Sequence, residues 1–293
     1  MGRRTILRSA QRVAMFALAI GLVAGAWELY RWLGPEKGGK LFGWTVLPKS
    51  KRTVMPGVFD ILGRLDDPLG RSGESIWWFL TKSAWYTLQL ALLGFVIGTL
   101  LGVVLAVVMS RLRMFERALM PYLVISQTVP LIALAPLVAG WGGKLSVFGW
   151  EWQRWTSVMA MGVFLSFFPV ALGTLRGLRS APAAALELMD SFAAPWRVTL
   201  WKLRFPAAVP HMVPAMKIGA AGAVIGVIVG EISVGLRGGV GRPIIEFAKQ
   251  NSNDPSKVYA AILAAAVVGL VMAMLVGAFD AFLMRRRPKE ATL

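Results

Sequence analysis

Long apolar stretches, separated by short charged segments, make up most of this sequence. The longest of them, residues 84–110, contains no ionisable side chain except Tyr86. A helix of about 20 apolar residues is long enough to cross the roughly 30 Å hydrocarbon core of a bilayer. The pattern therefore predicts an all-α polytopic membrane protein with about six transmembrane helices, at residues 13–30, 84–110, 119–140, 156–175, 213–233 and 258–284.

The segments between these spans divide the chain into an N-terminal tail with the first helix, a long external loop, a core with five transmembrane helices, and a short tail. These parts are expected at residues 1–32, 33–83, 84–284 and 285–293, and the core includes a long cytosolic loop at residues 176–210.

Basic residues indicate the orientation of the spans. They gather at residues 1–12, 111–117, 176–217 and 285–289. Because an excess of Lys and Arg marks cytoplasmic loops, both termini are expected in the cytoplasm. The N-terminal stretch has the charge layout of a signal sequence, but further spans follow and no clear cleavage site is present. We expect it to be retained as the first helix.

Composition agrees with a membrane protein and excludes several kinds of site. Hydrophobic residues make up 56% of the chain and charged residues 16%, against about 25% charged residues in a soluble domain. The net charge of +17 lies beside apolar spans, so membrane topology explains it and no nucleic-acid partner is expected. With no cysteine and only His211, neither a disulfide framework nor a metal site is expected.

Two of the predicted spans carry glycine at every fourth position. The rows are Gly94, Gly98 and Gly102 in the second span and Gly222, Gly226 and Gly230 in the fifth. Such a row lies on one helix face and lets another backbone approach closely. The rows indicate either general adaptation to packing in lipid or mobile contacts in a transport core.

The third span contains Pro130 and Pro136, which predict a kinked or broken helix. A broken helix is stable in a membrane only where protein or a water-filled cavity satisfies the freed backbone groups. Gln127, Thr128 and Pro130 are therefore candidates for a solute path. The alternative is a kinked helix whose polar groups bond to neighbouring helices.

Glu231 lies near the outer end of the fifth span, close to Ser233. An ionised carboxylate at membrane depth is costly unless it is paired or hydrated. Both residues are candidates for the solute path. Glu231 has a second interpretation, in which it lies at the interface and pairs with Arg237 or Arg242. In the last span, Asp280 is expected to extend toward Arg285.

The cytosolic loop predicts two short helices that need a partner surface. Pro195 suits the start of the second helix and Pro206 its end. Trp196 and Leu200 form an apolar stripe beside basic residues, and nothing else in the chain is expected to cover them. The candidate contact residues are Glu187, Asp190, Ser191, Ala193, Ala194, Trp196 and Arg197. The alternative is that this segment packs on the helix ends or on anionic lipid.

Three sequence segments resemble the permeases of ATP-binding-cassette (ABC) importers. Residues 205–210, Phe-Pro-Ala-Ala-Val-Pro, stand where these permeases have Leu-Pro-Ala-Ala-Leu-Pro, and the resemblance extends to residues 130–137 and 230–241. It covers roughly residues 80–285 and is greatest to permeases for nitrate, sulfonates, taurine, bicarbonate and pyrimidine or flavin vitamin precursors. The chain departs from the loop pattern at Phe192, which replaces the usual glycine, and at Glu187, the nearest acid to the displaced Glu-Ala-Ala triplet.

The resemblance implies a type I permease fold in a bacterial inner membrane. It also implies a homodimer of two permease copies, two cytosolic ATPase subunits that hold ATP and Mg²⁺, and an external substrate-binding protein. No cofactor is expected on this chain. Residues 34–41 nearly match a phosphate-binding loop, but Leu41 replaces the hydroxyl that would bind magnesium. The chain is therefore expected not to be an enzyme.

An ion-coupled secondary transporter or channel is the main alternative function. Broken helices and an intramembrane acid would serve such a protein equally well. It has no need for the long loop at residues 176–210, which favours the importer permease. The sequence leaves the solute open.

Overall fold

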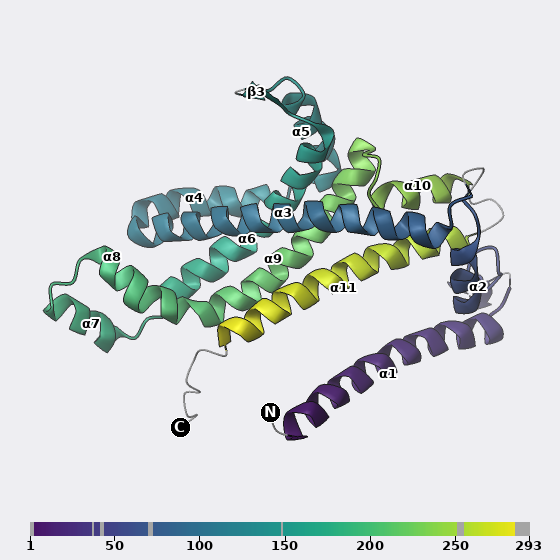
Figure 1. Ribbon diagram of the computed structural model, residues 1–293, viewed down its shortest axis with the longest axis horizontal. Coiled ribbons are helices and arrows are strands. Elements are labelled where there is room, and N and C mark those ends of the chain that lie inside the picture. Colours follow the sequence, from purple (N-terminus) through teal and green to yellow (C-terminus); the bar gives the residue numbers. More distant parts are fainter. Residues whose placement is uncertain are drawn as a thin grey trace. The chain divides into compact units, whose positions relative to one another are not determined.

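The computed structural model describes residues 3–36, 38–41, 44–69, 73–147, 149–250 and 255–284, and nearly all of its regular structure is helical (Figure 1). The helices are α1 (Arg3–Leu33), α2 (Val58–Gly63), the 3₁₀ turn η1 (Arg64–Asp66), α3 (Ile76–Arg111), α4 (Arg113–Ser126), α5 (Leu131–Gly142), α6 (Arg154–Leu178), α7 (Ala183–Ser191), α8 (Trp196–Thr199), the π-helical turn η2 (Leu200–Arg204), α9 (Phe205–Val234), α10 (Gly241–Gln250) and α11 (Ser256–Met284).

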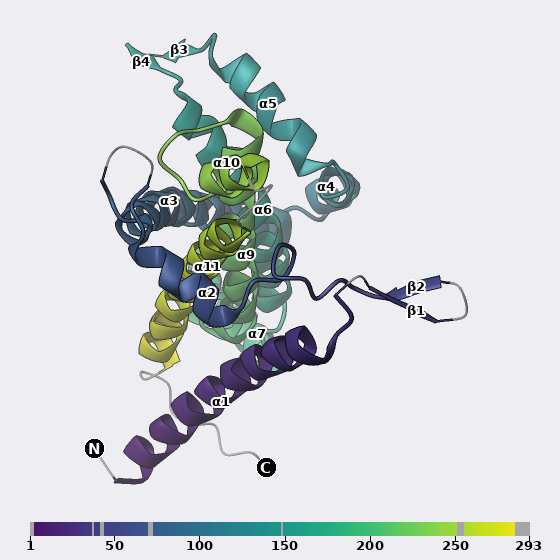
Figure 2. The same ribbon diagram turned by 90° about the vertical axis from the view of Figure 1, so that its right-hand side faces the viewer.

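Two short antiparallel hairpins are the only paired strands within the described residues (Figure 2). Strand β1 (Gly39–Leu41) pairs with β2 (Trp44–Leu47), and β3 (Ser146–Val147) pairs with β4 (Trp150–Glu151). The first hairpin includes the end of the segment that nearly matches a phosphate-binding loop. That segment follows a helix and leads into a strand, which is the reverse of the strand–loop–helix order that a phosphate-binding loop needs.

The chain forms two compact units. One comprises Met1–Phe79 and Ile244–Ile262, and the other comprises Leu80–Pro243 and Leu263–Leu293. In the first unit, the Trp27 indole donates a hydrogen bond to the Pro56 carbonyl at 3.0 Å and its ring meets Tyr259 edge-on. The predicted path residues and the loop at residues 176–210 lie in the second unit.

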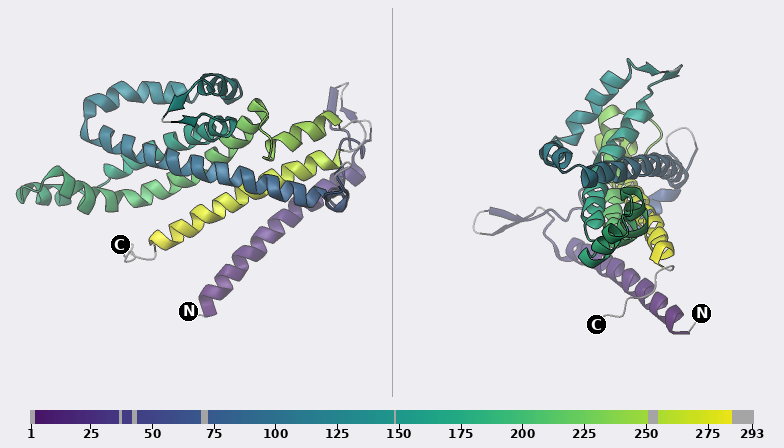
Figure 3. Two further views of the ribbon diagram at one scale, coloured as in Figure 1. Left: turned by 45° about the horizontal axis from the view of Figure 1, so that its top comes forward. Right: turned by 90° about the vertical axis from the view of Figure 1, so that its left-hand side faces the viewer.

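The predicted spans correspond to helices, and the third is broken as expected. Within the described residues, four helices are long and apolar enough to cross a membrane, and α4 with α5 makes up to a fifth span. These two helices meet at 105°, with the break just before Pro130 (Figure 3). Helix α1 covers the first predicted span, although several of its side chains lie outside the described residues. The tail at 285–293 also lies outside them.

Both glycine rows face the same helix, α6. A methyl group on Gly102 of α3 would lie 2.6 Å from the Phe167 carbonyl oxygen, and one on Gly94 would lie 3.0 Å from that of Met159. From the other side, a methyl group on Gly222 of α9 would lie 2.8 Å from the Leu165 carbonyl oxygen. Because contacts below 3 Å force a shift of the backbone, only glycine allows α3 and α9 to approach α6 this closely.

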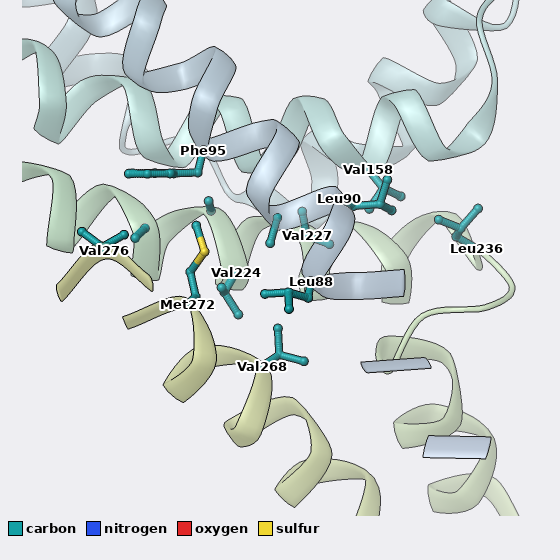
Figure 4. Close-up of a cluster of buried hydrophobic side chains, with 13 residues drawn as sticks. Leu88, Leu90, Phe95, Val158, Val224, Val227, Leu236, Val268, Met272 and Val276 are labelled. Atoms are coloured by element: carbon teal, nitrogen blue, oxygen red, sulfur yellow. The ribbon is translucent and has the colours of Figure 1, made fainter. Parts of the chain in front are cut away.

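Apolar side chains complete the packing on either side of these contacts. One buried cluster joins α3, α6, α9 and α11, and Figure 4 shows Phe95, Val158, Val227 and Met272 among its members. A second cluster joins the end of α3 to α4, α6 and the start of α9, and it includes Met109, Leu123, Leu175, Leu200 and Ala208. The two clusters fix α6 along most of its length.

The prediction that Pro206 ends a short helix is wrong. Residues Trp196–Val234 form one helical rod of 39 residues that passes through the proline. The π-helical turn η2 precedes Pro206, so the missing N–H of the proline falls where the helix already departs from regular i to i−4 bonding. The fifth span therefore begins at Trp196, nearly five turns (at about 3.6 residues per turn) before its predicted start at residue 213.

The close approach of α3 to α6 predicts that Gly→Ala substitutions at two positions have different effects on the free energy of unfolding. Gly102→Ala would place a methyl group against the Phe167 carbonyl and should lower the free energy of unfolding by about 1–3 kcal/mol, as overpacking does. Gly269→Ala in α11 has open space around the new methyl group. It should be neutral or stabilise by about 0.5–1 kcal/mol. Thermal unfolding of both variants in the same detergent measures this, and equal midpoints would contradict the packing described.

Candidate functional site

A cavity of about 660 Å³ opens between α6 and α9 beside the break in the third span. Its volume falls within the range of pockets that bind small organic molecules. Most of its wall is apolar. The lining residues are Gln127, Leu165, Phe168, Pro169, Leu172, Gly173, Arg176, Pro210, His211, Pro214, Ala215, Ile218, Ala221, Gly222 and Ile225.

Three side chains supply the polar groups of this cavity. Gln127 follows α4 at the break, and its amide nitrogen is buried without a hydrogen-bond partner. Buried amide donors normally have a partner, so this one is available to a solute or to water. Arg176 and His211 contribute exposed side chains from α6 and α9. In the described part of the chain, no three His, Asp or Glu side chains are grouped to hold a metal ion.

Prolines add backbone polarity to the same wall. Pro210 and Pro214 lie one turn apart in α9, and Pro169 lies within α6. Each proline lacks the N–H that would bond the carbonyl four residues earlier, which leaves that carbonyl without its helical partner. Such groups are tolerated in a membrane only where protein or water satisfies them. Two of these carbonyls belong to lining residues of the cavity, Leu165 and Pro210.

The structure does not bring the five predicted path residues together. Gln127 lines the cavity, whereas Thr128 is exposed and its hydroxyl donates to the Ile125 carbonyl at 2.8 Å. Pro130 precedes the first turn of α5. The Ser233 hydroxyl donates to the Val229 carbonyl at 2.7 Å. These local bonds satisfy the two hydroxyl groups, so the predicted role of Thr128 and Ser233 in a path has no added support.

Glu231 is fully buried (0% exposed) and bonds to neither Arg237 nor Arg242. The hydroxyl of Thr87, on α3, donates to one carboxylate oxygen at 2.8 Å, and the Gly241 N–H donates to the other at 2.8 Å. The Val240 N–H in turn donates to the Thr87 hydroxyl at 2.9 Å. This network, here called the Glu231 clamp, ties α3 and α9 to the start of α10.

Glycine is required around this carboxylate. A methyl group on Gly239 would overlap the Glu231 carboxylate, and one on Gly241 would lie 2.8 Å from the Glu231 Cβ. Gly238 has φ +104°, which side-chain-bearing residues rarely adopt. The glycine-rich sequence after the fifth span therefore forms a close-fitting turn around an acid, which explains why the two occur together.

The other intramembrane acid also has an unforeseen partner. Asp280 of α11 pairs with Lys217 of α9, with 2.6 Å between Nζ and Oδ2. The expected extension toward Arg285 concerns a residue outside the described part of the chain. The observed pair joins two helices, which lowers the cost of both charges near the membrane.

In the loop at residues 176–210, this chain itself buries Leu200 and partly covers Trp196, which corrects the expectation that nothing else in the chain covers them. Leu200 is only 4% exposed and belongs to the second apolar cluster. Trp196 packs on the same cluster, and the Arg111 guanidinium lies 5.1 Å from the centre of its ring. The end of α3 supplies this cover, which the spacing of residues within the loop does not reveal.

The exposed apolar surface of the loop lies instead on α7 and the turn after it. Leu188 and Phe192 project outward, and Phe192 is 75% exposed. Ala193 follows with φ +46°, the one positive φ at a residue other than glycine in the described chain. Glu187, Asp190, Ser191 and Arg197 are exposed around this surface, and Ala194 is half-buried. We call Leu188, Phe192 and these neighbours the loop surface.

The Glu231 clamp predicts that the stability of the protein depends more on the shape of the side chain at position 231 than on its charge. Glu231→Ala would leave the Thr87 hydroxyl and the Gly241 N–H buried without acceptors and should lower the free energy of unfolding by about 2–4 kcal/mol. Glu231→Gln retains the shape and an acceptor, so its cost should be about 1 kcal/mol or less. Thermal unfolding in detergent distinguishes them, with the exposed Glu187→Ala as control. Equal effects of Glu231→Ala and Glu187→Ala would rule the clamp out.

Comparison with known proteins identifies relatives of this chain. The profile of the binding-protein-dependent transport system inner membrane component matches residues 98–286. A probable ABC transporter permease protein of Haemophilus influenzae is 37% identical over 140 residues, which cover 47% of this chain and 53% of the relative. The formylaminopyrimidine transport permease protein ThiX of Halalkalibacterium halodurans is 35% identical, with 50% and 54% covered.

A third relative and a solved structure extend the match. The putative aliphatic sulfonates transport permease protein SsuC of Bacillus subtilis is 32% identical, with 61% of this chain and 60% of the relative covered. The chain thus spans a little over half the length of these relatives. The crystal structure of an amino acid ABC transporter with histidines matches with a TM-score of 0.54 and 18% identity, covering 69% of this chain and 93% of that chain.

The solved structure confirms the predicted permease fold, and the profile extends from α3 to the end of α11. Because that profile matches more than half of the chain, this protein belongs to the family of binding-protein-dependent transport system inner membrane components.

Proposed function

We propose that this chain is the permease subunit of an ATP-driven importer and that the cavity between α6 and α9 forms part of its solute path. The observation that carries the proposal is one helical rod, Trp196–Val234. The rod begins directly after the loop surface, and further along it contributes half of the cavity wall. A displacement of the loop would therefore move the wall of the cavity.

The mechanism is alternating access. An ATPase subunit docks on the loop surface, and closure of two such subunits around ATP displaces α7 and the start of the rod. Because Gly222 and Gly226 place α9 directly against the backbone of α6, the rod moves along α6 rather than away from it. ATP then shifts the population between states in which the cavity opens to opposite sides.

ATP and Mg²⁺ belong to the partner ATPase in this proposal. Residues 34–41 have neither the hydroxyl nor the strand–loop–helix order of a nucleotide site. The family's name supports a separate substrate-binding protein outside the cell. A second permease copy would close the open side of the cavity, in a bacterial inner membrane with both termini cytoplasmic. The arginines around the α3–α4 turn and the α6–α7 connection support this orientation.

The polar side chains of the cavity favour a solute that accepts hydrogen bonds. Gln127 and Arg176 donate hydrogen bonds, and His211 donates from at least one ring nitrogen. Sulfonates and formylaminopyrimidine, which two of the relatives are named for, both carry oxygen acceptors. We propose a small oxygen-bearing solute of this kind, an organic anion or a vitamin precursor.

The test of this function is uptake into proteoliposomes. The chain is reconstituted with its ATPase, and the binding protein is added outside with radiolabelled solute. Uptake should require ATP and both partners, and it should persist when ionophores collapse all ion gradients. Uptake that needs a gradient but no ATP would identify the alternative, an ion-coupled secondary transporter.

The loop surface predicts that Phe192 anchors the ATPase, in place of the stripe formed by the half-buried Trp196 and the buried Leu200. Phe192→Glu should weaken binding of the ATPase by about 30-fold, because an aromatic anchor at such a contact is worth about 2 kcal/mol or more. The matched control is Phe59→Glu on α2, another highly exposed phenylalanine, in the loop expected outside the cell. Co-purification measures both, and equal retention of the ATPase by both variants would exclude the loop surface as its docking site.

A further inference from the structure

A second cavity, of about 1020 Å³, lies at the α3–α4 turn, away from the proposed solute path. The ends of three helices and the π-helical turn η2 meet here. Its lining residues are Ser110, Arg111, Leu112, Arg113, Met114, Glu116, Arg117, Met120, Leu178, Arg179, Leu186 and Arg204. We call this space the arginine cavity.

Positive charge in this cavity greatly exceeds negative charge. Five arginines line it, and Glu116 is the one acid among the lining residues. Glu116 is already engaged by Arg179, whose two terminal nitrogens each donate to one carboxylate oxygen. The other four guanidinium groups have no acidic partner in the cavity wall. Since like charges so close together repel, an anionic ligand would stabilise the arrangement.

One of these arginines has a buried donor without an acceptor. The Nε atom of Arg204 is inaccessible to solvent and makes no hydrogen bond within the described structure. Arg111, from the end of α3, lies over the Trp196 ring, 5.1 Å from its centre. Guanidinium groups bind phosphate through two parallel hydrogen bonds, so a wall of arginines that lack an acidic partner matches a phosphate group.

The remainder of the wall is apolar, and part of it faces outward. Leu112 and Met114 form the α3–α4 turn with exposed side chains, and Met114 is 87% exposed. Met120, Leu178 and Leu186 continue the apolar lining inward. A free inorganic anion gains no binding energy from such apolar side chains. The acyl chains of a lipid do gain it, because they bury apolar surface against them. In the proposed topology, this turn lies at the cytosolic surface of the membrane.

We propose that the arginine cavity binds the phosphate headgroup of an anionic phospholipid from the cytosolic leaflet. Basic pockets between transmembrane helices on this side of a membrane suit such headgroups. The phosphate bonds to Arg204 and Arg113, and the acyl chains lie along Met114 and α4. The inference uses the membrane orientation proposed above but neither the solute nor the ATPase.

The lipid would join three elements that have different roles. Arg113 begins α4, the first half of the broken span, and Arg204 ends the π-helical turn of the rod. Arg179 follows α6. A bound headgroup therefore ties the start of the rod to the α3–α4 turn. Such a ligand sets how easily the loop moves, which makes transport dependent on the lipid composition of the inner leaflet.

The test titrates the purified full chain, in neutral detergent, with a short-chain fluorescent phosphatidylglycerol. Binding should saturate at one lipid per chain and should be at least about tenfold weaker for phosphatidylcholine with the same acyl chains. Arg204→Gln and Arg113→Gln should each weaken binding by about tenfold or more. Lys202→Gln removes an equal charge from the same turn outside the cavity, and it should change the affinity less than about twofold.

Competing ligands and further variants distinguish a lipid site from other kinds of anion site. Displacement by inorganic phosphate or glycerol 3-phosphate at the same concentrations as the lipid would identify a soluble-anion site and overturn it. Equal losses in Lys202→Gln and Arg113→Gln would show diffuse attraction and also overturn it. If Arg204→Gln does not fold, the exposed Arg113 carries the test, and Arg204→Lys should recover part of the affinity. Displacement of the lipid by the ATPase would assign the cavity to that partner instead.

Discussion

The close contact of α6 with the glycine rows of α3 and α9 is the constraint on which the second unit depends. In a membrane, lipid tails are as apolar as leucine, so helices associate through close packing rather than through the hydrophobic effect. Gly94 and Gly102 on one side and Gly222 and Gly226 on the other bring backbones into direct contact with α6. These contacts hold the three helices together. The proposed mechanism requires that they also permit motion along the helix axes.

The other features take their positions from this arrangement. The cavity lies beside the prolines of α6 and α9 and the break after α4. The Glu231 clamp fixes one end of α9 to α3, and the second apolar cluster holds its other end through Leu200. The loop surface and the arginine cavity both lie at that second end. Signals from a protein partner or from lipid would thus reach the same helix that forms the cavity wall.

Features set by local spacing could be predicted from the sequence, and those set by distant partners could not. Apolar length located the spans, Pro130 located the break, and four-residue spacing identified the glycine rows. The prediction that Pro206 ends a helix is wrong because a π-helical turn directly before it lets the helix continue through the proline. No short sequence pattern reveals such a turn. Glu231 finds Thr87 at a separation of 144 residues, and Trp196 is covered by Arg111 from the end of α3. The sequence identifies Gln127 as a candidate path residue, but the places of Arg176 and His211 in the cavity wall depend on tertiary packing.

The central claim is that ATP alternates the access of the cavity between α6 and α9, and one accessible thiol tests it most directly. The chain has no cysteine, so Ile218→Cys places a single thiol at an exposed position in the cavity wall. Its labelling by a membrane-impermeant thiol reagent is followed in proteoliposomes with the ATPase. Phe59→Cys, in the loop that is expected outside the cell, serves as control. The account predicts that ATP changes the rate at Ile218→Cys by about tenfold or more and leaves the control unchanged. An ATP-independent rate at Ile218→Cys would contradict it.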